Sequence, residues 1–310
     1  MTISHPDKGH PTVAESHPQE QPGGRLPPVQ ALLGIVVFLG AQVLAGLAAA
    51  GVGPLIKEPG TTTLFFAAYA ALSLLGLAAL LRGLARADLR VTFARAGIAR
   101  EVGLGTLIGA GLIGVGGLVM FAAGAYRGTD PSLNAGILLG LMLAVGTAVG
   151  EEVLFRGVLL RVLNARFGSS VAVAALSVLF GLAHVGNAGA GVLGAVAIAI
   201  SAGLLLNVAY LLTGRLWLAI GIHFGWNAMQ SAFFGTDVSG TGSGRGLFAG
   251  HLSGPGWLSG GAMGMEGSWV IMALGLGAGI ALTVLAVRRG RWRSWSTARA
   301  ETAQAKAGLA

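Results

Sequence analysis

The chain has 310 residues, of which 54% are hydrophobic and only 10% are charged, and its formal net charge is +8. Soluble domains carry about 25% charged residues, so this composition excludes an ordinary water-soluble globular protein. The chain has no cysteine, which excludes disulfides, cysteine-ligated metal sites and a thiol nucleophile.

Residues 1–27 form a polar start to the chain, rich in Pro, Gln, His and Gly and without hydrophobic periodicity. This composition predicts a disordered cytoplasmic tail, and its acids and prolines argue against a secretory signal. His5, His10 and His17 fit a solvated tail better than a metal site.

Eight apolar runs follow, and several of them have the roughly 20 residues that a helix needs to cross a bilayer. They predict membrane-spanning helices over residues 29–50, 62–81, 102–124, 135–163, 169–186, 190–213, 215–235 and 269–288. The arginine-rich residues 82–101 predict an interfacial amphipathic segment, and the Gly-rich residues 236–268 form the longest loop. The predicted fold is an all-α integral membrane bundle of about eight transmembrane helices, with its membrane domain over 28–288 and a basic, polar tail over 289–310.

The basic residues predict the orientation of this bundle. With the N-terminus in the cytoplasm, sixteen Lys and Arg residues fall on inner segments, and only Lys57, Arg127 and Arg245 fall on outer loops. This asymmetry agrees with the positive-inside rule, so both termini are predicted to be cytoplasmic. The same placement favours a role in topology over binding to nucleic acid. Lysine is rare beside 17 arginines, and Ala and Gly abound, a bias that suits a GC-rich bacterial genome. The predicted location is therefore a bacterial plasma membrane, which the chain crosses several times.

The predicted spans contain very few ionisable side chains. Acidic residues occur there only as Glu151 and Glu152, and Arg156 is the one basic residue well inside a span. Charged groups at bilayer depth are unfavourable by about 2.5 kcal/mol or more, so they are functional candidates. The other strong polar groups considered with them are His184, His223 and Asn227.

The spacing of these residues indicates a shared site. Glu152 and Arg156 are four residues apart on one helix face and can form an ion pair, which leaves Glu151 to point elsewhere. The same spacing relates Phe180 to His184 and His223 to Asn227. A carboxylate can act as a base for water, and His and Asn can hold a developing oxyanion. The set therefore suffices for water-activated hydrolysis.

These groups also have structural interpretations. A pair of Glu152 with Arg156 can brace two helices, and intramembrane His and Asn often form hydrogen bonds between helices. Function is the better interpretation for the set as a whole, because it is confined to three helices. Asn207, in the sixth helix, keeps the structural interpretation, and Glu266 and His251 are assigned to loops.

Three motifs occur in order on successive hydrophobic helices: EEVLFR (151–156) fits EExxxR, FGLAH (180–184) fits FxxxH, and HFGWN (223–227) fits HxxxN. Together they resemble the CPBP family of intramembrane proteases, which comprises the type II CAAX prenyl endopeptidases and bacteriocin-processing, Abi-like relatives. The resemblance covers a protease-like core over residues 135–235. The segment MEGSW (265–269) is also similar to a late segment of bacterial members.

The resemblance implies a CAAX-type intramembrane endopeptidase, with a peptide or membrane protein as its substrate. By motif, Glu151 and His184 would activate water, and His223 and Asn227 would hold the oxyanion. Supporting roles fall to Glu152, Arg156 and Phe180. Zinc held by Glu151, His184 and His223 is an alternative, although the sequence has no HExxH motif, and the metallo and metal-free glutamate mechanisms both stay open.

Two other functions are weighed against a protease. The first is a non-catalytic scaffold or immunity protein of the same fold, and the complete set of Glu, His, His and Asn argues against it. The second is a proton-coupled transporter that shuttles charge through buried Glu and His. The sequence lacks the repeated halves of many transporters, which argues against this function.

Counting residues from the inner ends of the predicted helices does not bring the histidines to one depth. At roughly 1.5 Å per residue, His223 lies about 12 Å deep, and His184 lies well beyond that.

Overall fold

The computed structural model describes residues 27–85, 97–129, 131–242, 244 and 246–307. The predicted disordered tail over 1–27, with its three histidines, lies outside the described residues apart from its last position. Most of the predicted amphipathic segment over 82–101 also lies outside them.

Helices account for nearly all of the regular structure, which confirms the predicted all-α membrane class. The α-helices are α1 (Pro27–Val52), α2 (Gly60–Leu80), α4 (Ile98–Ala122), α5 (Ala135–Glu152), α6 (Arg161–Leu182), α7 (Gly191–Ile198), α8 (Leu204–Thr213), α9 (Leu216–Ala228), α10 (Gly256–Ser259), α11 (Trp269–Arg288) and α12 (Trp295–Ala307). Shorter π-helical segments cover Leu81–Ala85, Val153–Leu160, Ala199–Gly203 and Met229–Phe234, and 3-10 turns cover Gly261–Met263 and Met265–Gly267. Two short strands, β1 (Tyr126–Arg127) and β2 (His251–Leu252), pair antiparallel.

Six helices in the described residues are long and apolar enough to cross a membrane: Val29–Val52, Gly60–Gly83, Ile98–Ala122, Ala135–Leu182, Gly191–Thr213 and Trp269–Arg288. Their outer faces are apolar as well. Along α1, for example, Leu32, Val36, Val43 and Leu47 recur at helical spacing and are all exposed. Exposure of so large an apolar surface to water would be unfavourable, so these faces are suited to contact with lipid.

The rod from Ala135 to Leu182 is not one continuous helix, because its backbone breaks at Gly168. This glycine has φ 78° and ψ 173° inside α6, a backbone conformation that residues with a Cβ rarely adopt. The backbone N–H of Ser169 donates to the carbonyl of Arg293 at 2.9 Å, and the N–H of Arg293 donates to the Ser169 hydroxyl at 2.9 Å. The segment before α12 is therefore fastened to the break.

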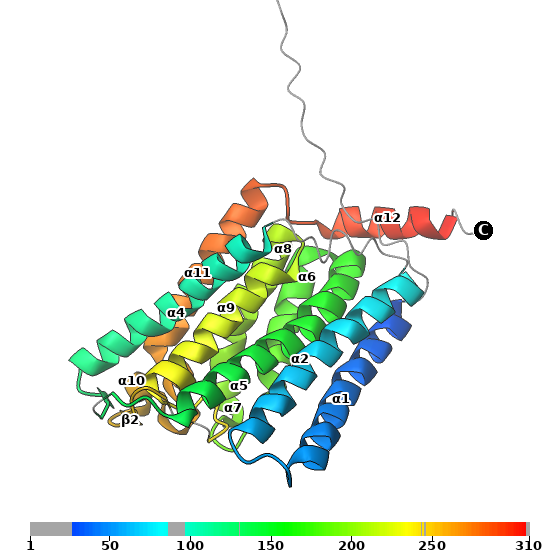
Figure 1. Ribbon diagram of the computed structural model, residues 1–310. Helices are drawn as coiled ribbons and strands as arrows, with labels where there is room; N and C mark the ends of the chain where they lie inside the picture. The colour runs from blue at the N-terminus through cyan, green and yellow to red at the C-terminus, as the bar shows by residue number, and fades with distance from the viewer. Residues whose placement is uncertain (1–26, 86–96, 130, 243, 245, 308–310) are drawn as a thin grey trace, which may run out of the picture.

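Figure 1 shows how the helices lie beside one another: α4, α9, α5, α2 and α1 follow in this order across the front of the bundle. Helices α6, α7 and α8 complete the bundle behind them, and α8 packs against both α9 and α11. Helix α9 is therefore surrounded by α4, α5 and α8, which explains why most of its side chains are buried.

Helices α4 and α9 approach so closely that glycine is required where they touch. A Cβ on Gly109 would lie 2.0 Å from the carbonyl oxygen of Ile222, and one on Gly225 would lie 2.3 Å from that of Thr106. Gly105 and Gly221 face the partner backbone in the same way. Small residues allow this kind of backbone contact between membrane helices, and the contact fixes α9 in the bundle.

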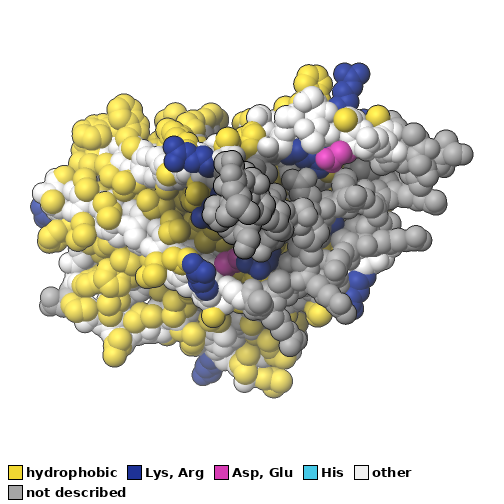
Figure 2. Space-filling model, turned by 90° about the horizontal axis from the view of Figure 1, so that it is seen from above, with side chains coloured by type: hydrophobic (Ala, Val, Ile, Leu, Met, Phe, Trp, Pro, Cys, Tyr) yellow, Lys and Arg dark blue, Asp and Glu magenta, His cyan; other side chains and the backbone are white. Residues whose placement is uncertain are grey.

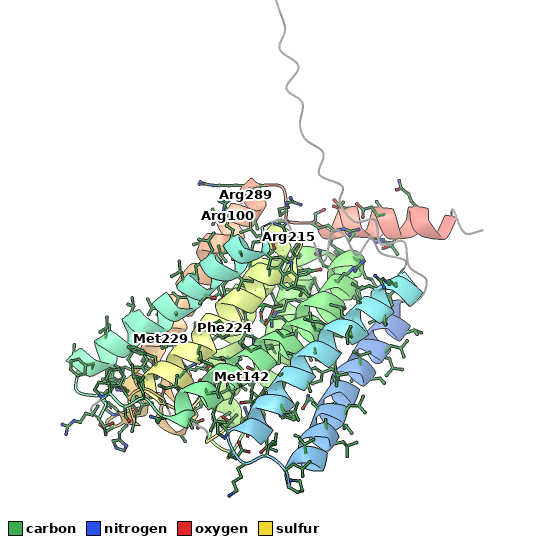
Figure 3. All side chains as sticks on the ribbon, viewed as in Figure 1. Arg100, Met142, Arg215, Phe224, Met229 and Arg289 are labelled. Carbon is green, nitrogen blue, oxygen red and sulfur yellow. The ribbon has the colours of Figure 1, made fainter. Side chains whose placement is uncertain are left out.

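The two ends of the bundle differ in charge and structure. Arg100, Arg215 and Arg289 lie at one end (Figure 3), which Figure 2 views face on with basic side chains spread across it. Helix α12 lies across the same end (Figure 1) and packs on α6, so the predicted polar tail over 289–310 contains a helix. Arg215 forms an ion pair with Glu101 here.

The loops of the opposite end hold the two strands and the Gly-rich segment between α9 and α11. The Tyr126 hydroxyl donates to the carbonyl of Phe234 at 2.9 Å and so joins this segment to β1. Burial raises the pKa of Tyr126 to about 12, so the hydroxyl stays protonated as a donor even in alkaline solution. Hydrogen bonds therefore help to hold this end of the molecule together.

Candidate functional site

The seven predicted site residues come together inside the bundle, on four helical segments. Glu151 and Glu152 end α5, and Arg156 follows in the π-helical segment Val153–Leu160. Phe180 is near the end of α6, with His184 just beyond it, and α9 carries His223 and Asn227. The break at Gly168 lies nearly midway in sequence between Glu151 and His184, so the antiparallel rods on either side of it bring these two residues to one level.

The Glu151 carboxylate lies between the two imidazole rings. Its Oε2 is 3.8 Å from Nε2 of His184 and 4.0 Å from Nε2 of His223. The same oxygen is buried and has no hydrogen-bond partner among the described residues, although the side chain as a whole is 19% exposed. The arrangement thus leaves one carboxylate oxygen available to a small molecule that can also reach both rings.

Hydrogen bonds at Nδ1 determine which way each ring faces. The Nδ1 atom of His184 is 2.7 Å from the carbonyl oxygen of Phe180, and Nδ1 of His223 is 2.9 Å from Oε1 of Glu152. A carbonyl and a carboxylate accept hydrogen bonds, so Nδ1 carries a proton in both rings. The Nε2 atoms are therefore the ones presented to Glu151.

Glu152 and Arg156 form the predicted ion pair, at 2.8 Å between Oε1 and Nη1, with both side chains fully buried. Arg156 also donates from Nε to Oδ1 of Asn207 at 3.0 Å. The Asn207 amide in turn donates to Ser177 at 3.2 Å. Asn207 therefore forms interhelical hydrogen bonds as expected, but it is also a direct partner of the site arginine.

Phe180 packs between the charged groups and the rings. The Arg156 guanidinium carbon lies 4.4 Å from the centre of its ring, a cation–π distance. The Phe180 ring meets those of His184 and His223 edge to face, with centroids 4.9 Å and 6.1 Å apart. These contacts give Phe180 a structural part in holding both imidazoles.

Three of the π-helical segments lie next to the site. Val153–Leu160 directly follows Glu151 and Glu152, and Ala199–Gly203 directly precedes α8. Met229–Phe234 begins two residues after Asn227. Arg156 lies within 3.4 Å of the Gly203 carbonyl at the end of Ala199–Gly203. Such segments are frequent at functional sites in helices, and each supplies or contacts a residue of this one.

Asn227 is buried, and its amide Nδ2 donates to the Thr147 hydroxyl at 3.0 Å. Thr147 lies on α5, one turn before Glu151. Asn227, on α9, thus lies beside α5, the helix that carries Glu151, and it also lines a pocket. The pocket is lined by Phe180, His184, Ile198, Ala202, Leu205, Leu206, Ile222, His223, Trp226, Asn227, Ser239 and Glu266.

Glu266 is a pocket residue that the sequence analysis missed. It lies in a loop, as predicted, but its side chain is buried. Its Oε1 accepts from Trp226 at 2.8 Å and from Gln230 at 2.7 Å, and its Oε2 accepts from Ser239 at 2.8 Å. The sequence feature that could have indicated Glu266 is the MEGSW segment, which places this acid within a Gly-rich stretch. His251, by contrast, is exposed on β2.

Glu151, His184 and His223 are the three residues expected to hold zinc if the reaction uses a metal. Within the described residues, no group of three or more His, Asp or Glu side chains is arranged to hold a metal ion. In Glu151, His184 and His223, Oε2 of the carboxylate lies 3.8 Å and 4.0 Å from the two Nε2 atoms.

The family model for Rce1-like type II CAAX prenyl endopeptidases matches residues 133–229, which include all three motifs. No curated protein and no solved structure matches the chain. The matched segment runs from the start of α5 to the end of α9 and so contains Glu151, His184, His223 and Asn227. The predicted resemblance is confirmed: residues 133–229, which carry all three motifs, are similar to the Rce1-like type II CAAX prenyl endopeptidases.

Proposed function

We propose that the protein is an intramembrane endopeptidase that hydrolyses a peptide bond with a water activated by Glu151 and His184. The observation that carries this proposal is the buried, unpartnered Oε2 of Glu151, which lies within 4.0 Å of Nε2 of both histidines. Polar atoms at such separations are commonly bridged by water. A water held there would have a base beside it and two further polar contacts.

In the proposed reaction, Glu151 takes a proton from this water while the oxygen attacks the carbonyl carbon of the scissile bond. His184, oriented by its bond to the Phe180 carbonyl, accepts a hydrogen bond from the water at Nε2. Breakdown of the tetrahedral intermediate returns the proton from Glu151 to the leaving amine. Proton transfer by a positioned side chain typically contributes 10²- to 10⁴-fold, roughly, to a rate.

His223 and Asn227 are proposed to stabilise the negative oxygen of the intermediate. With Nδ1 held by the Glu152 carboxylate, the doubly protonated His223 ring would donate from Nε2 to the oxyanion. The second N–H of the Asn227 amide supplies another donor, because the first is bound to Thr147. Donors held in place in this way stabilise charge that develops in the transition state.

The substrate is proposed to be a peptide or membrane protein that enters from the bilayer. Apolar side chains of α8 and of the segment before it, including Leu205, Leu206 and Ala202, line the pocket beside the polar groups. We further propose eight membrane crossings with both termini cytoplasmic. The break at Gly168 divides one long rod into two, and Leu216–Phe234 forms another, whose His, Asn and Gln lower its hydropathy. A bacterial plasma membrane is the proposed location.

The test is cleavage of a quenched fluorescent peptide library by the purified, detergent-solubilised protein. Glu151→Gln keeps the shape of the side chain and removes the base, so the cleavage rate is expected to fall by roughly 100-fold or more. Glu58→Gln is the matched control, because Glu58 bonds to Thr62 at the far loop between α1 and α2. Equal cleavage by wild type and a folded Glu151→Gln variant would overturn the mechanism.

A chelator arm in the same assay tests the zinc alternative at Glu151, His184 and His223. Unchanged cleavage after chelation supports the metal-free glutamate mechanism, whereas loss of cleavage that added zinc restores supports the metallo mechanism. If the wild-type protein cuts no member of the library while it binds peptides, the scaffold alternative is supported instead.

A further inference from the structure

Thr147 occupies a position on α5 that the proposed mechanism does not use directly. It lies one helical turn before Glu151, on the same face of the helix, and its side chain is half-buried. The Thr147 hydroxyl lies between two groups: the backbone carbonyl of Leu143, at 2.8 Å, and Nδ2 of Asn227, at 3.0 Å. It therefore joins the helix of the carboxylate to the helix of the oxyanion donor.

The chemistry of the hydroxyl determines the orientation of the Asn227 amide. A threonine hydroxyl has a single proton, and here that proton is donated to the Leu143 carbonyl. The oxygen can then only accept from Asn227, so the NH₂ group of the amide must face Thr147 and its carbonyl oxygen must face away. A flipped amide would place two acceptors against each other unless the hydroxyl gave up its bond to Leu143.

This orientation matters because an amide has two N–H groups and one oxygen. With Nδ2 held at Thr147, one N–H is engaged and the other stays available for an oxyanion in the pocket that Asn227 lines. Without the acceptor at Thr147, the amide is free to rotate and to present its oxygen, which repels an oxyanion. A misplaced catalytic group of this kind lowers a rate by up to roughly 100-fold.

We infer that Thr147 is a positioning residue for the oxyanion donor: it fixes the rotation of the Asn227 amide so that an N–H faces the scissile carbonyl. The inference rests on the proposed function, since it assigns Asn227 to the oxyanion. Thr147 itself touches neither the substrate nor the attacking water.

The kinetic test compares Thr147→Val, which keeps the shape and removes the acceptor, with Thr147→Ser, which restores it. Thr147→Val is expected to lower kcat by about tenfold or more, with KM changed by less than about twofold, and Thr147→Ser to return kcat close to the wild-type value. In an Asn227→Ala background, Thr147→Val should have no further effect, because the two residues act as one unit.

Thr283→Val is the matched control. The Thr283 hydroxyl donates to the carbonyl four residues earlier, that of Gly279, at 2.8 Å, as Thr147 does to Leu143, but it lies on α11 away from the site. If Thr147→Val cleaves like Thr283→Val while Glu151→Gln is inactive, the inference is overturned and the proposed function stands. Additive effects of Thr147→Val and Asn227→Ala overturn it as well.

A second measurement tests the inference without any substrate. In protein labelled with ¹⁵N-asparagine, the side-chain amide signals of Asn227 are assigned by their loss in Asn227→Ala. They are expected to shift in Thr147→Val and to stay in place in Thr147→Ser and Thr283→Val. Signals that do not move in Thr147→Val contradict the inference even if the protein cuts no peptide, so this result is separate from a failure of the proposed function.

Discussion

Two buried carboxylates border the candidate site, and they are held in different ways. Glu152 bonds to the cation Arg156 and to His223, whereas Glu266 accepts only from neutral donors, namely Trp226, Gln230 and Ser239. Both networks end on α9 or the segment that continues it. Glu152 therefore holds α9 at His223, and neutral hydrogen bonds attach a loop to Trp226 and Gln230, one and two turns further along.

A buried carboxylate does not need a cation if enough hydrogen-bond donors converge on it. Each hydrogen bond to a charged group is stronger than one between neutral groups, and three of them replace part of the hydration that Glu266 loses on burial. The two sites should nevertheless respond differently to mutation. Removing Glu152 leaves a charge behind, and removing Glu266 leaves only neutral groups.

The largest effect is expected for Glu152→Ala. This variant leaves the fully buried Arg156 guanidinium without its carboxylate, and breaking a buried pair from one side lowers the free energy of unfolding by about 3–5 kcal/mol. Thermal or denaturant unfolding in detergent measures the change, with Glu58→Ala as the control for a solvent-side acid. A loss below about 1 kcal/mol would mean that Arg156 is not desolvated as the structure has it.

The next effect should come from a change that disturbs both networks at once. Gly109→Ala places a methyl group against the Ile222 backbone, where the added Cβ would lie 2.0 Å from the carbonyl oxygen. Because backbone cannot move aside as a side chain can, a loss near the upper end of the overpacking range, about 3 kcal/mol, is expected, together with slower cleavage. Gly111→Ala on the same helix is the control, since nothing lies within 4 Å of its added Cβ. Equal stability of the two variants would contradict the close α4–α9 contact.

The two networks also differ in how far the sequence predicted them. Glu152 and Arg156 lie on one helix at a spacing of four, so helical periodicity alone predicts that they meet, and hydropathy marks them as unusual. The apolar runs were predictable for a similar reason, because a backbone in lipid must satisfy its own hydrogen bonds within a helix. Local rules therefore predicted the helices and the motif residues on them.

The partners of Glu266 are 27 to 40 residues away along the chain, and no local rule relates residues at that separation. The depth of His184 was mispredicted for the same reason, since residue counting assumes straight helices that start at equal heights. The break at Gly168 and the contact between Glu151 and His184 depend on how the rods pack. Asn207 was correctly assigned to interhelical bonding, but its partner Arg156 could not be identified from the sequence.

A smaller effect than that of Glu152→Ala is expected for Glu266→Ala, because it leaves donors unpaired but no charge. Unsatisfied buried groups of this kind lower the free energy of unfolding by roughly 2 kcal/mol. Glu266→Gln keeps one carbonyl acceptor at nearly the same volume and should recover part of the loss. The comparison of the two carboxylates fails if unfolding measurements show Glu266→Ala to be as destabilising as Glu152→Ala, since that would require a cationic partner for Glu266.

The smallest effect is expected for Ser239→Ala, which removes one of the three donors to Glu266. Hydrogen bonds between side chains in membrane proteins contribute roughly 0.6 kcal/mol on average, and Ser239 is only half-buried, so a loss of about that size is expected. A double-mutant cycle with Glu266→Ala measures the pair directly, because the effect of Ser239→Ala should vanish once its acceptor is gone. If the two losses add instead, Ser239 stabilises the loop through some other contact. Glu266 would then be held by α9 and its continuation alone, and the loop residue would have no part in keeping the carboxylate at the pocket.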